Sequence, residues 1–190
     1  MRLHQRHLSL GTAASALIVA VAALVPAAPV RLAVVPLERG PMQTFEESCA
    51  RCHGTNGENY GTEFGRHLSD SELRKVTREM ADGPGAVQLD TRALDAQVAL
   101  HRAWILREPF VAWVKSSRSG WSGEVSPGTK LTARAGGKPI AVKMDGTRWS
   151  ISKAATAPVL TARVGSRQVT LDLAKAAHTH TKPLPKSKTR

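Results

Sequence analysis

Two thiols and an imidazole lie within one short stretch of this 190-residue chain. Cys49 and Cys52 are its only cysteines, and His53 follows the second cysteine directly. Two cysteines separated by two residues and followed by histidine form the attachment pattern of c-type haem. In that chemistry each thiol adds to one vinyl group of the porphyrin, and the imidazole becomes the proximal ligand of the iron. The spacing therefore predicts one covalent haem c, with its iron, held by Cys49, Cys52 and His53.

Three other interpretations of the cysteine pair stay open. A thioredoxin-type redox pair belongs in a strand–helix–strand context, and no such pattern surrounds Cys49. A zinc site needs a second pair of ligands at a suitable spacing, whereas His67 and His101 are isolated in the sequence. The third interpretation is a coincidental pair without shared chemistry.

The residues around the cysteines match a known family. The stretch 44–57 resembles the opening of a small class I cytochrome c domain, with Phe45 four residues before the first cysteine. Gly54 after the histidine and Gly57 fit the same pattern. The resemblance covers about residues 41–115 and implies an all-α domain that carries one haem and transfers single electrons.

The second axial ligand of the iron is the point where the chain departs from that family. The family carries a methionine before its last helix, usually followed by proline, and no Met-Pro pair exists between residues 54 and 120. Met80 is the methionine of this stretch, and we expect it to be the second metal ligand beside His53. The alternatives are His101, His67 or an open site.

The identity of that ligand separates three candidate functions. A thioether raises the redox potential, a second imidazole lowers it, and an open site admits small ligands to the iron. We expect an electron carrier rather than a catalyst, and no residue outside the haem motif suggests catalysis. The alternatives are a haem-based sensor or peroxidase-like enzyme with an open distal site, and a binding module in which the haem is structural.

The N-terminal segment has the pattern of an export signal. Arg2 and Arg6 precede a long, nearly uncharged apolar run, which predicts a cleaved signal peptide or a retained membrane anchor over residues 1–35. Either form delivers the rest of the chain to the outer side of the bacterial cytoplasmic membrane. We therefore expect a protein that is periplasmic or anchored on that face.

The charge of the chain indicates the kind of partner. Lys and Arg number 27 against 15 Asp and Glu, which gives a formal net charge of +12. A basic surface attracts anionic partners, so we expect acidic redox proteins and association with the anionic membrane surface. No nucleic-acid-binding motif is present, and we expect no specific nucleic-acid partner.

Periodicity and capping residues predict three helices in the first half of the chain. A capping box within 44–47 predicts a helix from about Thr44 to Cys52. A second box at 69–72 opens another helix, which the sequence 83–85 ends. A third helix is predicted from residue 90 or 91 to about Leu106, and the loop 54–67 should pass the haem edge. By the family resemblance, Phe45 should contact Trp104.

The second half of the chain changes to a period of two. Five runs alternate apolar and polar residues, at 130–134, 139–144, 147–151, 159–164 and 168–173. Turn sequences at Asp145-Gly146, Gly136-Gly137 and Gly165-Ser166 separate them. We expect an α+β chain: a haem domain at 41–115, a linker at 116–123, a sandwich-like all-β module at 124–173 and a disordered basic tail at 174–190.

Overall fold

The computed structural model describes residues 37–175 and Thr179. Residues 37–175 belong to one compact unit. The predicted signal or anchor at 1–35 lies outside the described residues, as does most of the predicted disordered tail. Among the residues that are described, no helix is long and apolar enough to cross a membrane.

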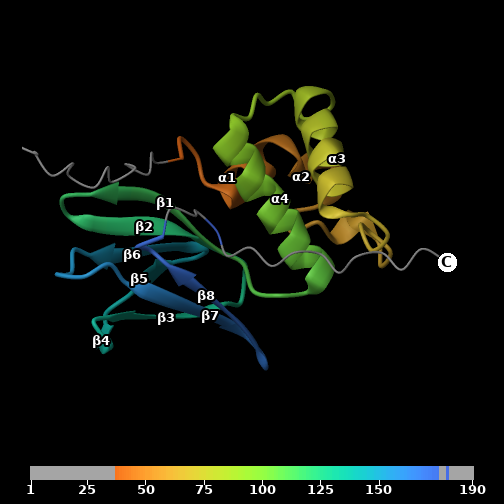
Figure 1. Ribbon diagram of the computed structural model, residues 1–190. Coiled ribbons are helices and arrows are strands. Elements are labelled where there is room, and N and C mark those ends of the chain that lie inside the picture. The colour runs from red at the N-terminus through yellow and green to blue at the C-terminus, as the bar shows by residue number, and fades with distance from the viewer. Residues whose placement is uncertain (1–36, 176–178, 180–190) are drawn as a thin grey trace, which may run out of the picture. The chain divides into compact units, whose positions relative to one another are not determined.

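The first half of the described chain is helical, as expected (Figure 1). The elements are α1 (Pro41–Ser48), α2 (Ala50–His53), the 3-10 turn η1 (Glu58–Tyr60), α3 (Asp70–Asp82) and α4 (Thr91–Leu106). The predicted starts of α3 and α4 are confirmed, because Ser69 and Glu72 form a capping box and Asp90 accepts a hydrogen bond from the Ala93 amide at 2.7 Å.

Helix α1 begins earlier than its sequence predicts. Its first residue is Pro41, and the N-cap Gly40 supplies no side chain. The Glu124 carboxylate instead accepts hydrogen bonds from the amides of Met42 at 2.8 Å and Gln43 at 3.3 Å. A Cβ on Gly40 would lie 2.1 Å from the Glu124 carboxyl carbon, so the close approach requires glycine here. The predicted capping box at 44–47 therefore does not open this helix.

The second half of the described chain forms eight strands in two antiparallel four-stranded sheets. One sheet has the order β1-β2-β6-β5 and the other the order β4-β3-β7-β8. The strands are β1 (Val111–Ser117), β2 (Gly120–Val125), β3 (Lys130–Ala135), β4 (Lys138–Ile140), β5 (Lys143–Asp145), β6 (Arg148–Ser152), β7 (Val159–Val164) and β8 (Arg167–Asp172). The chain is thus α+β, and the three predicted turn sequences join β3 to β4, β5 to β6 and β7 to β8.

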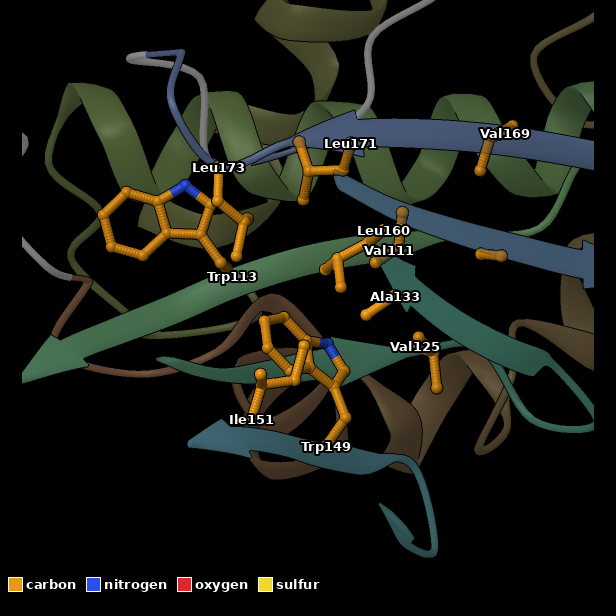
Figure 2. Close-up of a cluster of buried hydrophobic side chains, with 11 residues drawn as sticks. Val111, Trp113, Val125, Ala133, Trp149, Ile151, Leu160, Val169, Leu171 and Leu173 are labelled. Carbon is orange, nitrogen blue, oxygen red and sulfur yellow. The ribbon is translucent and has the colours of Figure 1, made fainter. Parts of the chain in front are cut away.

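The two sheets face one another across a shared apolar core. Figure 2 shows side chains from both sheets meeting there, among them Trp113 and Trp149 from one sheet and Leu160 and Leu171 from the other. Trp149 is 2% exposed, and its indole nitrogen donates to the Ala112 carbonyl at 3.2 Å. The period-two pattern of β3, β6, β7 and β8 therefore reflects one face of each of these strands turned toward this core.

The expected linker at 116–123 is wrong. These residues form the end of β1, the turn after it and most of β2. Their serines suggested a flexible joint, yet they lie on a hairpin whose glycine and tryptophan pair with β6. The helices are also no separate all-α domain, because Phe110 and Ala112 are buried with Phe45 and Leu100 in one cluster.

Candidate functional site

The predicted attachment motif lies on two short helical segments. Helix α1 ends at Ser48, α2 starts at Ala50, and Cys49 stands between them. The His53 amide donates to the Cys49 carbonyl at 3.1 Å, so one turn separates the first thiol from the imidazole. Cys49 is half-buried, Cys52 is exposed, and both thiols are free. The single helix predicted from about Thr44 to Cys52 is therefore divided at Cys49.

A mainly apolar cavity of about 260 Å³ adjoins this turn. It brings together residues that are far apart in sequence: Cys49 and His53 from the motif, Met80 from α3 and His101 from α4. The remaining lining residues are Thr44, Tyr60, Phe64, Leu73, Val76, Thr77, Ala81, Val87, Leu89 and Gln97. Cys52 is not among the residues that line it, and neither is His67, which is exposed.

The predicted contact between the first and last helices is confirmed. The rings of Phe45 on α1 and Trp104 on α4 meet edge to face, with centroids 4.7 Å apart and planes at 77°. Phe45 is fully buried, and its ring also lies 6.5 Å from the His53 ring. This packing fixes α1, and with it the motif, against α4.

A hydrogen-bonded chain runs along the cavity wall. The Tyr60 hydroxyl lies 2.9 Å from His101 Nε2, and His101 Nδ1 lies 2.7 Å from the Gln97 carbonyl. The Tyr60 ring stacks on His53 at 4.4 Å and on Phe64 at 3.8 Å. The Tyr60 ring therefore stacks on the His53 imidazole, and the Tyr60 hydroxyl is hydrogen-bonded to the His101 imidazole.

Burial determines the protonation of these groups. Desolvation lowers the pKa of His101 to about 4, although its hydrogen bond to Gln97 acts in the opposite direction, so the ring is neutral at pH 7. Desolvation also raises the pKa of Tyr60. Burial, and then the neighbouring Cys52, raises the pKa of Cys49. A reactive redox cysteine has a lowered pKa instead, so Cys49 is unlike one.

Gln97 leaves one polar atom without a partner. Its side chain is 2% exposed, and its amide nitrogen donates to the Pro41 carbonyl at 2.7 Å. Its Oε1 has no hydrogen-bond partner within the described part of the chain. Buried acceptors are nearly always satisfied, so the lone Oε1 is an exception among the buried side chains of the described residues.

A second hollow lies on the other side of Tyr60 and Phe64. This groove of about 450 Å³ runs between the loop 56–66, the end of α4 and the segment 126–127. Tyr60 and Phe64 line both the groove and the cavity. Two aromatic side chains from an irregular loop thus separate the two spaces.

The cavity brings together part of what a covalently held haem requires, because Cys49 and His53 line it and Cys52 does not. Nowhere in residues 37–175 or at Thr179 do three or more His, Cys, Asp or Glu side chains gather as metal ligands. A haem iron needs only one or two protein ligands, and the porphyrin needs apolar walls. A thiol, an imidazole and a mainly apolar cavity lie together here.

Three residues that line the cavity, Tyr60, Phe64 and Gln97, were not identified as site residues from the sequence. Tyr60 and Phe64 lie in a loop without periodicity, and Gln97 looks like an ordinary polar position of α4. The useful signal was compositional, because Tyr60 is the only tyrosine of the chain.

Comparisons with known proteins add no assignment: no protein-family model, curated protein or solved structure matches the chain.

Proposed function

We propose that this chain is an exported c-type cytochrome that carries one haem on Cys49 and Cys52 and transfers single electrons between redox proteins. The observation that carries the proposal is the meeting of Cys49, His53 and two further candidate ligands, Met80 and His101, at one mainly apolar cavity. Helices α1, α3 and α4 would then form the haem-binding part, as the resemblance to class I cytochromes c over residues 41–115 implies.

The residues of the chain have distinct tasks in this proposal. A haem bound there supplies a reversible one-electron couple between ferrous and ferric iron. The Cys49 and Cys52 thiols would hold the porphyrin at the segment that contains α2, and the His53 imidazole would ligate the iron. Leu73, Val87 and Leu89 exclude water from the cavity, which disfavours the more highly charged oxidised form.

The charge of the chain supports a protein partner. With a formal charge of +12, the molecule complements acidic redox proteins, and such complementarity accelerates encounter more than it tightens binding. Export to the outer side of the cytoplasmic membrane, free or anchored, is part of the same proposal, because covalent haem attachment takes place on that side in bacteria, as the family resemblance implies.

Redox titration of the full chain tests the proposal. The protein is produced in a bacterial host that attaches haem to exported proteins, and its absorption spectrum is followed as the potential is changed. We expect one reversible one-electron transition and no rapid binding of carbon monoxide by the ferrous protein. Rapid and complete carbon monoxide binding would instead favour the sensor or peroxidase-like function.

A further inference from the structure

His101 presents one ring nitrogen to the cavity and anchors the other to the backbone. The side chain is 7% exposed on α4. Its Nδ1 lies 2.7 Å from the Gln97 carbonyl, which accepts hydrogen bonds only, so Nδ1 carries the hydrogen. Its Nε2 therefore carries the lone pair, which accepts the Tyr60 hydroxyl hydrogen at 2.9 Å.

This is the arrangement that metal-binding histidines share. A histidine ligand almost always donates its second ring N–H to a carbonyl or carboxylate, which fixes the tautomer and the ring orientation. His101 has that support, and its side chain lines the cavity that His53 also lines.

The competing ligands lack these features. Met80 lines the cavity, yet it is 45% exposed. His67 is exposed and lines no part of the cavity. Among the residues considered as ligands from the sequence, His101 is the one that is buried and already oriented by a backbone hydrogen bond, and the lone pair of its Nε2 accepts the Tyr60 hydroxyl.

We propose that His101, and not Met80, is the second axial ligand of the haem iron. The inference rests on the proposed covalent attachment at Cys49 and Cys52, and it departs from the thioether ligand that the resemblance to class I cytochromes c implies. The chain would then hold its iron between two imidazoles, a ligand pair that lowers the redox potential.

The Tyr60 side chain must move away from His101 Nε2 before this nitrogen can bind iron. Its hydroxyl occupies the Nε2 lone pair, and its ring stacks on His53. Gly57 and Gly61 flank the η1 turn that carries it, both with positive φ, at 73° and 75°. The groove of about 450 Å³ behind the ring offers the phenol a place to move.

The same movement would also make room for the porphyrin. The cavity of about 260 Å³ is smaller than the roughly 300–1,000 Å³ of most cofactor pockets. Because Tyr60 and Phe64 line both spaces, their displacement would join the cavity to the groove.

The test begins with the unaltered full chain, which avoids any question of a variant's folding. The ferric haem protein is studied by low-temperature electron paramagnetic resonance and by near-infrared magnetic circular dichroism. We expect the low-spin signature of two imidazoles. A signature of imidazole and thioether, or a high-spin signal from a single axial ligand, would overturn the inference.

Three variants then identify the second imidazole. His101→Leu should lose the low-spin signal and gain rapid carbon monoxide binding, while Met80→Leu and the matched histidine control His67→Leu should keep the signal. Retention of the two-imidazole signal by His101→Leu would overturn the assignment. A denaturing gel stained for haem separates the failure of this inference from the failure of the proposed function. If the protein stains for haem but His101 is not a ligand, only the inference fails. If the protein does not stain, covalent haem attachment is absent and both proposals fail.

Discussion

At the residue scale, Glu124 is a buried carboxyl with a structural task. It is 5% exposed and accepts two amide hydrogen bonds at the start of α1. Burial raises its pKa from the ordinary 4.5, and Glu46 adds to the rise, although the amides of Met42 and Gln43 and the Arg148 side chain oppose it. The folded protein therefore binds a proton at Glu124 more readily than the unfolded chain does.

The stability of the protein should depend on pH through this group. Because the folded-state pKa is raised, the stabilisation from protonating Glu124 is fully present below about pH 4.5 and is lost as pH rises through the raised value. We expect the free energy of unfolding, relative to Glu124→Gln, to fall as pH rises from about 4.5 toward neutrality.

Urea unfolding at a series of pH values checks this prediction. Glu79→Gln, at an exposed position paired with Lys75, is the control and should leave the slope of the unaltered protein unchanged. Parallel curves for the unaltered protein and Glu124→Gln would show that burial of the carboxyl has no energetic consequence.

The sequence singled out Cys49 and His53, which line the cavity, but it gave no sign of most of the cavity's other lining residues. Cys49 and His53 were recognisable because covalent and metal chemistry require fixed spacing within one helical turn. The hydrogen-bonded chain from Tyr60 to Gln97 depends on the tertiary approach of a loop to α4, and no local pattern encodes it.

At the scale of elements, the strands supply charged caps to the helices. Glu124 on β2 caps the N-terminus of α1, and Arg167 on β8 donates to the carbonyls of Leu106, at 2.9 Å, and Arg107 at the C-terminus of α4. An anion at a helix start and a cation at a helix end are the signs that the helix dipole favours.

Loss of the Arg167 cap should weaken the protein. We expect Arg167→Gln to lower the free energy of unfolding by about 1 kcal/mol, because two terminal carbonyls lose a charged donor. Arg163→Gln is the matched control, since the Arg163 side chain donates to the Gln168 side chain across the same hairpin. Equal losses in both variants, measured by urea unfolding, would show that the contact with α4 contributes nothing.

Capping and periodicity predicted some elements and missed others for identifiable reasons. Helices α3 and α4 carry their own capping residues, so local sequence determines where they start. The start of α1 depends on Glu124, more than eighty positions away. Strand β1 opens with a continuous apolar run because both of its faces are covered, Val111 and Trp113 by the sheets' core and Ala112 by the helices.

At the scale of the whole molecule, the helices and sheets share buried residues. Phe110 and Ala112 pack with Phe45 and Leu100, while Val111, between them in sequence, packs in the core between the sheets. The sequence suggested two modules joined by a linker because residues 116–123 are small and polar and the pattern changes to a period of two from Gly123. Neither signal reveals that the two parts share buried residues.

The described chain should therefore unfold in one step. In Trp104→Phe, which removes the tryptophan of α4, we expect far-ultraviolet circular dichroism and tryptophan fluorescence to give the same urea midpoint. The circular dichroism reports mainly on the helices, and the fluorescence then reports on Trp113, Trp121 and Trp149 of the sheets. Two separate midpoints would contradict the single unit and restore the two-module interpretation.

The central claim is that the cysteine pair holds a haem, and intact-mass spectrometry of the denatured, alkylated protein tests it most directly. The exported protein, produced where c-type haem is attached, should carry the added mass of one haem and no alkyl group, and Cys49→Ala/Cys52→Ala should carry neither haem nor label. A colourless protein alkylated on both Cys49 and Cys52 would contradict the account.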